Sequence, residues 1–311
     1  MEIDSPFEHD GIWLRCALHA HTTNSDGELA PARLAAHYKR AGYDVLCITD
    51  HWVRTDESAN DLILLPGVEL NATLDGTESD AHVLAIGVEA DPVEPGRRFP
   101  NLQETVDWIR ENGGLAFLAH PYWSGLRVEE FLGCEGLLGL EVYNAGCDLE
   151  IGRGLSSVHW DEALEAGTHL LGLATDDSHL PGFDSGFASV WARVPQRHPD
   201  EVLDALAHGR FYSSAGPRIE TVELTDDTVV VRCSPAASVA LITQRWVGSR
   251  VNAGRMGYRC RGTVLEETPS GEIVAASLER WSSLPYGRVE VTDAHGRRAW
   301  TNPLWFSNSG A

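Results

Sequence analysis

The N-terminal part of the chain alternates short apolar runs with segments whose apolar side chains recur at helical spacing. The apolar runs, which we interpret as buried strands, occupy residues 14–18, 45–48, 62–66, 115–119 and 170–174, and a further run begins at residue 81. The helical segments end at or just before a glycine, as helices often do, and occupy residues 31–42, 102–112, 161–167 and 199–209. This alternation predicts parallel β-α units. In a barrel of such units the C-terminal ends of the strands converge on one site.

Residue types that bind metal ions stand where these apolar runs end. His19 and His21 follow the run at 14–18, and because side chains two apart on a strand point the same way, both imidazoles can reach one ion. Asp177-Ser178-His179 follows the run at 170–174 in the same manner. Further histidines and carboxylates stand between these two pairs. The full set of candidate ligands is His19, His21, Asp26, His51, Glu69, His82, His120, Asp177 and His179.

These candidate ligands exceed what one metal ion needs. A first-row ion in tetrahedral or octahedral geometry takes about four to six ligands, water included, so we expect two or three divalent ions. Glu69 is the expected bridging carboxylate. The mixture of nitrogen and oxygen donors suits zinc, manganese or iron rather than calcium, which prefers oxygen alone.

The same residues form motifs that resemble those of a known family, the PHP (polymerase and histidinol phosphatase) metallohydrolases. The resemblance covers about residues 12–216, with the motifs in the expected order. The motifs that carry it are His19-Ala20-His21-Thr22 with Ser25-Asp26-Gly27, Thr49-Asp50-His51, Gly67-Val68-Glu69, His120-Pro121 and Asp177-Ser178-His179. It implies an α/β fold with a distorted, TIM-like (β/α)7 barrel and a trinuclear metal site.

The resemblance also implies how the ligands divide among three ions. One ion would be held by His19, His21, Glu69 and Asp177, a second by Glu69, His82 and His120, and a third by Asp26, His51 and His179. His82 is placed by the apolar run Val83-Leu84-Ala85-Ile86 that follows it. Glu69, Asp177 and His120 are the expected catalytic residues, acting at the metals.

Residues next to these motifs are candidates for substrate contact or for support of the ligands. Asn144 ends an apolar run, so both substrate contact and a turn-forming role fit it, and Trp123 suits either a pocket wall or ordinary packing. Arg127 and Arg153 are the candidate phosphate contacts. Asp50 and Asp176 each precede a candidate ligand and face the other way on an extended chain, so we expect an orienting or structural role for both.

The pattern of the chain changes near residues 213–217. Beyond them, short alternating stretches separated by turns replace the helical segments, at residues 228–233, 239–243 and 288–292. This indicates an antiparallel β-sandwich, so we predict a metal-binding domain over residues 1–216 and a small all-β domain over 217–311. The order of the two resembles the CehA/McbA branch of the PHP proteins, some of which hydrolyse aryl carbamates.

Composition limits the classes of partner. The chain has 311 residues, 43% of them hydrophobic, yet no apolar run reaches the roughly 18 residues of a membrane span and no leader pattern begins it, so we expect a cytoplasmic protein without membrane contact. A formal net charge of −22 argues against extended nucleic acid, but not against a small anion at the metals. The cysteines show no paired spacing and are expected to be reduced thiols: Cys16, Cys47, Cys134, Cys147, Cys233 and Cys260.

The expected activity is hydrolysis of a small-molecule substrate by a metal-bridging hydroxide. Phosphoester hydrolysis is the first interpretation, because three clustered cations suit a dianionic phosphate better than a neutral group. Hydrolysis of a carbamate or amide, such as an aryl carbamate, is the alternative. A metal-binding module without turnover is a third hypothesis.

Overall fold

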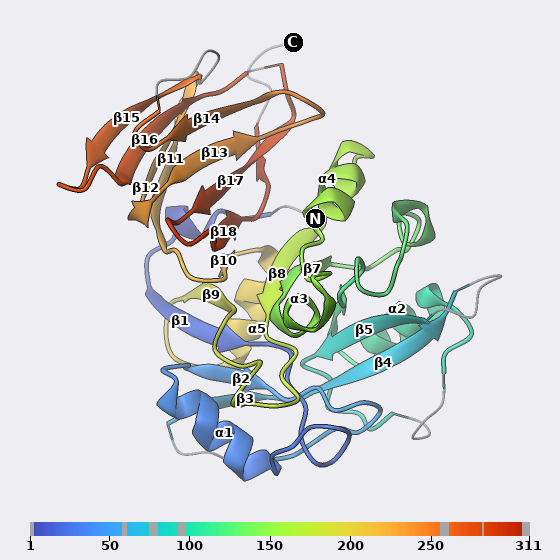
Figure 1. Ribbon diagram of the computed structural model, residues 1–311. Helices are drawn as coiled ribbons and strands as arrows, with labels where there is room; N and C mark the ends of the chain where they lie inside the picture. The colour runs from blue at the N-terminus through green and yellow to red at the C-terminus, as the bar shows by residue number, and fades with distance from the viewer. Residues whose placement is uncertain are drawn as a thin grey trace.

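The structure, a computed structural model, describes residues 3–57, 61–74, 80–92, 98–255, 261–281 and 283–306. Figure 1 shows an N-terminal lobe in which helices lie around short strands, and a C-terminal lobe, drawn in orange and red, that is built from strands. The fold is therefore of mixed α/β class, as predicted. No helix in the described ranges is long and apolar enough to cross a membrane.

The N-terminal lobe contains all the α-helices that the structure describes. They are α1 (Pro31–Arg40), α2 (Leu102–Glu111), α3 (Ala145–Ile151), α4 (Ser157–Glu165) and α5 (Pro199–His208), with the 3-10 turns η1 (Pro6–Glu8) and η2 (Val128–Glu130). The strands of this lobe are β1 (Ile12–Ala17), β2 (Val45–Cys47), β3 (Ile63–Leu65), β4 (Gly67–Thr73), β5 (Asp80–Ile86), β6 (Leu115–Leu118), β7 (Gly139–Asn144), β8 (Leu171–Thr175), β9 (Ser189–Val194) and β10 (Phe211–Ser214).

Three of the helices match their predicted ranges closely because their ends carry ordinary signals. α1 and α5 start at a proline, and α2 starts where the Asn101 side chain accepts a hydrogen bond from the Glu104 amide. α4 starts earlier than predicted, since its first turn is polar or exposed and shows no apolar spacing. α3 was not predicted, because a helix of one to two turns has too few buried positions to show a period.

The predicted distorted (β/α)7 barrel is not observed, because the strands of the described residues do not close into one sheet. The strands form two separate sheets, β4-β5-β6-β7-β8 and a longer one that includes β9-β1-β2-β3. Isolated bridges link the two sheets where Ala20 meets Ser178 and where His51 meets Glu69. Side chains from both sheets still share one apolar core, which includes Leu14 and Phe117.

The strand directions also depart from a purely parallel pattern. β4 pairs antiparallel with β5 and β5 with β6, while β9 runs antiparallel to β1 and β10. Glu69 lies within β4, which corrects the expectation that it follows a strand, and His82, expected at the start of an apolar run, lies within β5. Because β5 runs antiparallel beside β4, His82 pairs with Asn71, and its side chain lies next to that of Glu69.

The C-terminal lobe is an antiparallel sandwich, as the alternating pattern predicted. Its strands are β11 (Ile219–Leu224), β12 (Thr228–Ala236), β13 (Ser238–Ile242), β14 (Gly248–Asn252), β15 (Gly262–Glu267), β16 (Ile273–Glu279), β17 (Tyr286–Thr292), β18 (Arg298–Thr301) and β19 (Leu304–Trp305). The sheet β11-β12-β16-β15 packs on the β14-β13-β17-β18 layer through a core that includes Val231, Leu278 and Val291.

The two lobes share one sheet. Its order is β14-β13-β17-β18-β10-β9-β1-β2-β3, so backbone hydrogen bonds between β10 and β18 cross the predicted boundary at residues 216 and 217. The buried Arg288 adds a paired hydrogen bond from β17 to Asp161 on α4, at 2.7 and 2.8 Å. The division into two domains remains a prediction, with its parts joined along a continuous sheet.

The cysteines within the described ranges form no disulfide with one another. Cys16, Cys47, Cys147 and Cys233 are buried thiols, and Cys134 is partly buried. Cys260 lies outside the described residues.

Candidate metal centre

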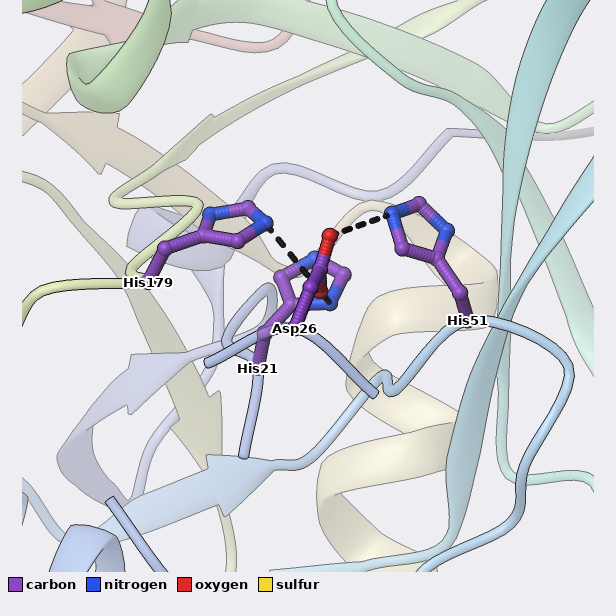
Figure 2. Close-up of side chains that lie close together, drawn as sticks. All are labelled: His21, Asp26, His51 and His179. Atoms are coloured by element: carbon purple, nitrogen blue, oxygen red, sulfur yellow. Dashed lines mark ion pairs between the residues drawn. The ribbon is translucent and has the colours of Figure 1, made fainter. Parts of the chain in front are cut away.

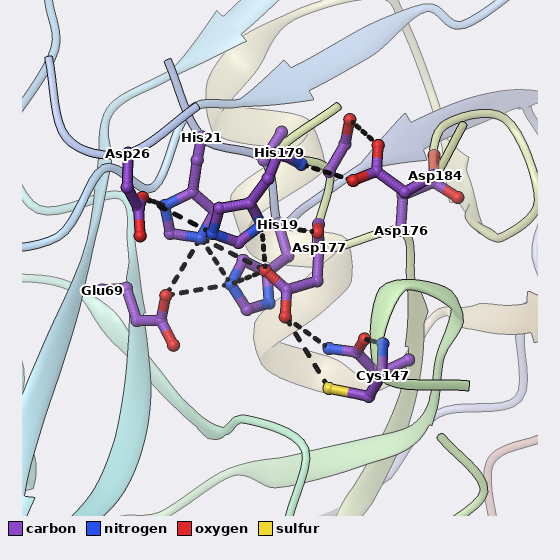
Figure 3. A network of polar contacts seen from close by, with 12 residues as sticks. His19, His21, Asp26, Glu69, Cys147, Asp176, Asp177, His179 and Asp184 are labelled. Atoms are coloured by element: carbon purple, nitrogen blue, oxygen red, sulfur yellow. Dashed lines mark hydrogen bonds and ion pairs between the residues drawn. The ribbon is translucent and has the colours of Figure 1, made fainter. Parts of the chain in front are cut away.

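The structure brings the candidate ligands together at one end of the N-terminal lobe, where all of them except His120 form three overlapping groups that could each hold a metal ion. The first group is His19, His21, Glu69 and Asp177, the second is His51, Glu69 and His82, and the third is His21, Asp26, His51 and His179. Figure 3 shows the first group at the centre of a polar network, and Figure 2 shows the third.

The first group is fully buried, and its ligand atoms face one another. The Nε2 atoms of His19 and His21 lie 3.1 Å apart, and each lies 3.1 Å from Oε2 of Glu69. Oδ1 of Asp177 lies 3.1 and 3.2 Å from the same two nitrogens, and it has no hydrogen-bond partner. The protein thus directs imidazole nitrogens and carboxylate oxygens at one point, which is the donor set of a metal cation.

The pKa values of the buried histidines show which positive charges a metal cation would replace. Burial lowers the pKa of His19, but Asp177, Glu69 and Glu141 outweigh it and hold that pKa well above its ordinary value. Burial also lowers the pKa of His21, but Asp177 and Glu69 outweigh it and raise that pKa to about 9. Protons on these rings balance the carboxylates, so metal ions and protons compete for the same nitrogen atoms.

Glu69 links the first group to the second. Its Oε2 faces His19, His21 and, at 3.5 Å, Nδ1 of His51. Its Oε1 lies 2.8 Å from Nδ1 of His82 and 3.4 Å from Nε2 of His120. Two oxygens that face different sets of imidazoles are the arrangement that a bridging carboxylate requires.

The hydrogen bonds of His82 fix the position of its proton. Trp52 Nε1 donates to Oδ1 of Asn71, and Nδ2 of Asn71 donates at 2.8 Å to Nε2 of His82. The ring therefore carries its proton on Nδ1 and donates it to Glu69. His82 supports the bridging carboxylate in this arrangement, and its role as a ligand stays a prediction.

The third group lies nearer the surface, around the half-exposed Asp26. Nδ1 of His21 and Nε2 of His179 each lie 3.4 Å from Oδ1 of Asp26, and Nε2 of His51 lies 3.6 Å from Oδ2 (Figure 2). His179 keeps its proton on Nδ1, which donates to the backbone carbonyl of Asp177 and leaves Nε2 facing Asp26.

These groups match the implied division of ligands only in outline. The four residues implied for one ion form the first group without change. His51 takes the place of His120 in the second group, and His21 joins the third. The ligand sets of three separate ions therefore stay predictions.

Glu141 is a supporting residue that the sequence analysis missed. Its Oε1 accepts hydrogen bonds from Nδ1 of His19 at 2.7 Å and from Thr175 at 2.6 Å. Its Oε2 accepts from the His120 backbone amide and from Asn144, both at 2.8 Å. By holding the His19 proton on Nδ1 it leaves Nε2 free to face the other ligands. The available signal was a carboxylate inside the apolar run of β7, where burial without a partner would be costly.

Asn144, Asp50 and Asp176 take supporting positions. Asn144 caps α3 by accepting from the Cys147 amide, and it donates to Oδ2 of Asp177, which fits the turn-forming alternative. Asp50 accepts from Ser25 in the turn that carries Asp26, and Asp176 accepts from the amides of residues 186–188.

Two of the expected catalytic residues have left-handed backbone conformations. The φ angle is +28° at His120 and +52° at Asp177. Such conformations cost about 1–3 kcal/mol each in non-glycine residues and gather at functional sites. Each residue lies two positions after the end of a strand, His120 after β6 and Asp177 after β8.

A cavity of about 560 Å³ opens beside the metal-binding groups. His51, His82, His120 and His179 form part of its floor, and its walls include Trp123, Leu149, Glu150, Leu180 and Phe183. No arginine or lysine is among its described lining residues. Substrate would therefore meet the ligands through a mainly apolar and acidic entrance.

The two candidate phosphate contacts lie outside this cavity. Arg127 is exposed and pairs with Glu130 in its own turn, and the Arg153 guanidinium lies 5.5 Å from the Tyr122 ring. Trp123, in contrast, lines the cavity, with its ring 5.0 Å from that of His120. We include Trp123 in the candidate site and leave the two arginines out.

Comparison with solved structures supports the fold. A two-domain protein of Bacteroides vulgatus that contains a predicted PHP-like metal-dependent phosphoesterase aligns over 98% of both chains, with a TM-score of 0.55 and 16% sequence identity. An amidohydrolase of Chromobacterium violaceum aligns over 63% of this chain and 96% of its own, with a TM-score of 0.44 and 17% identity. No protein-family model and no curated protein sequence matches this chain. The chain thus shares its overall fold with this two-domain protein.

Proposed function

We propose that this chain is a metal-dependent hydrolase of the PHP type that cleaves phosphoester bonds in small molecules. The observation that carries the proposal is the buried convergence of acceptor atoms from His19, His21, Glu69 and Asp177. Two or three divalent ions, of zinc, manganese or iron, are the proposed cofactors. The order of the lobes supports a place in the CehA/McbA branch, which we include in the proposal.

Each part of the site has a distinct role in this reaction. Divalent ions at such a site acidify a bound water molecule, polarise the bond under attack and stabilise the departing oxygen. His19, His21 and Asp177 would hold the innermost ion, and the Glu69 carboxylate would join it to a second. His120 faces Glu69 from the side of the cavity, and Glu141 fixes the orientation of His19 from behind.

The nucleophile in this proposal is water. Among the described residues that line the cavity, the one thiol is Cys147, and none carries a hydroxyl or an amine. Burial, reinforced by the charge of Asp177, raises the pKa of the Cys147 thiol far above its ordinary value, so the thiol stays protonated and unreactive.

The test is a screen of protein reconstituted separately with zinc, manganese and iron. The substrates are p-nitrophenyl phosphate, nucleotides, sugar phosphates and an aryl carbamate. We expect hydrolysis of at least one phosphoester, with inorganic phosphate as a competitive inhibitor because product and substrate share the same ions. The absence of turnover in every metal-loaded sample would favour the non-catalytic hypothesis.

Carbamate or amide hydrolysis is the second candidate, and the composition of the cavity favours it. Since no described lining residue is an arginine or a lysine, the protein itself offers no cation to a dianionic substrate outside the metal centre. Turnover of 1-naphthyl methylcarbamate with a kcat/KM well above that of every phosphoester would reverse the ranking. It would leave the metal-binding residues unchanged.

A further inference from the structure

We propose that the substrate carries a compact apolar group, aromatic or branched aliphatic, which binds against an apolar wall beside the metal centre. The wall consists of Trp123, Leu149, Leu180 and Phe183. The inference rests on the proposed function in that the same cavity must hold the reacting bond, but it concerns recognition and holds for either bond class.

The first observation is the exposure of the wall. Leu149 is 41% exposed, Leu180 is 51% exposed and Phe183 is 57% exposed, although each could have been polar without loss of any core. All three line the one cavity that contains the metal-binding residues. Single exposed apolar side chains need no explanation, whereas a group that surrounds a polar centre marks a ligand-binding surface.

The second observation is that the wall is fixed relative to the metal centre. Nε1 of Trp123 donates at 2.8 Å to Glu150 on α3, and its ring makes a T-shaped contact with that of His120. Asp184 accepts from the amide of His179 at 2.8 Å (Figure 3). It also accepts from the amide of Leu180 at 2.8 Å, so one carboxylate positions a candidate ligand and a wall residue together. A wall that is ordered before binding loses little entropy when a ligand contacts it.

The third observation is the charge of the remaining lining. Outside the buried ligands Glu69 and Asp177, the carboxylates of the described lining are Asp26, Glu150 and Asp184, and no lysine or arginine among the described lining residues balances them. Anionic groups beyond the one bound at the metals, such as the extra phosphates of a nucleotide, would meet repulsion there. An uncharged apolar substituent meets none and buries its surface against the wall.

The experiment measures binding instead of turnover. Methylphosphonate and phenylphosphonate carry the same metal-binding head group and differ in the apolar group, and their Kd values for the metal-loaded full chain are obtained by isothermal titration calorimetry. Acetohydroxamate and benzohydroxamate repeat the comparison with another head group. We expect the phenyl compound of each pair to bind about tenfold more tightly, which corresponds to partial burial of one ring.

Variants locate the preference. Leu180→Ser and Phe183→Ser should each reduce the phenyl preference at least threefold, while Val158→Ser should leave it unchanged. Val158 is the matched control because it is 64% exposed on α4 and does not line the cavity. A thermal unfolding curve for each variant confirms that it is folded.

The outcomes separate this proposal from the proposed function. Absence of a phenyl preference in both pairs, or a preference that survives both wall variants, overturns the apolar wall even if the protein hydrolyses phosphoesters. A phenyl preference that the wall variants abolish supports it, even if no ester in the screen is hydrolysed.

Discussion

Two carboxylates organise the metal centre in opposite surroundings, Glu69 inside the protein and Asp26 at its edge. Glu69 is buried, and its two oxygens face imidazoles from four different chain segments. Asp26 is 54% exposed and faces His21, His51 and His179 across gaps of 3.4 to 3.6 Å. Glu69 is positioned by strand β4, whereas Asp26 lies in a turn that solvent reaches.

This difference predicts different affinities for metal at the two places. Around Glu69, water is excluded, so neighbouring lone pairs repel strongly unless a cation or protons lie between them. Around Asp26, water screens the same repulsion and can complete the coordination of an ion. We therefore expect the inner ions to bind tightly and the outer ion to exchange readily.

The largest effect should come from Glu69→Gln. This change removes the charge shared by two inner ligand groups, so metal content should fall by more than one ion per chain and activity by about a thousandfold or more. Elemental analysis and kcat/KM on the best substrate of the screen measure both. His37→Gln and His208→Gln are the controls, because neither histidine belongs to a metal-binding group or lines the cavity, and they bond to Ser185 and to Asp204. Comparable losses at all three positions would mean that the centre is misplaced.

Glu141→Gln should have the second largest effect and should act on the inner ions alone. A glutamine keeps the shape but loses the charge that holds the His19 proton on Nδ1, so metal affinity should fall about 10- to 100-fold. Competition with a chromophoric chelator gives the affinity, and the visible spectrum of cobalt-substituted protein reports the altered geometry. Asp50→Asn is the matched variant on the outer side, since Asp50 fixes the turn of Asp26. Equal losses of the inner ion in Glu141→Gln and Asp50→Asn would contradict the prediction that different residues support the inner and the outer ions.

Asp26→Asn should have a smaller effect and complete the comparison. Without this carboxylate the outer ion should be lost while the inner ions remain, so metal content should fall by about one ion per chain. Activity at saturating metal should fall less than in Glu69→Gln. Equilibrium dialysis against graded chelator concentrations makes the measurement, and it should remove the same ion first from the unaltered protein. Loss of all ions together would show that the centre binds metal as one unit.

How far the sequence predicts this site differs between the same two regions. Two ligand pairs can be recognised in the sequence because each follows an apolar run at the spacing of a strand. They are His19 with His21 and Asp177 with His179. Glu69 also stands out, but its place inside an antiparallel pair does not, because pairing direction depends on chain segments far away in the sequence. The same limit applies to the open sheets. Alternating strands and helices predict β-α units, but they do not determine whether the outer strands pair to close a barrel.

Supporting residues were the hardest to predict. Glu141 lies in an apolar run and has no motif of its own, and its function becomes clear only when His19, His120 and Asn144 meet it in space. The wall residues Leu149 and Phe183 resemble ordinary surface positions in the sequence, because exposure and a shared cavity are properties of the folded chain. Arg127 and Arg153, in contrast, were predicted as phosphate contacts from their charge alone, and both lie outside the cavity.

The smallest effect should follow from replacing those arginines. Arg127 pairs with Glu130 and Arg153 lies over Tyr122, both outside the cavity, so Arg127→Ala and Arg153→Ala should each change the inhibition constant of inorganic phosphate less than twofold. In Asp26→Asn the same constant should rise clearly, because an ion that binds phosphate is lost. A competition assay with the best substrate of the screen measures all three variants. A tenfold weaker inhibition in either arginine variant would mean that the chain segment carrying that arginine closes over bound anions, and would extend the site beyond the metal centre and its apolar wall.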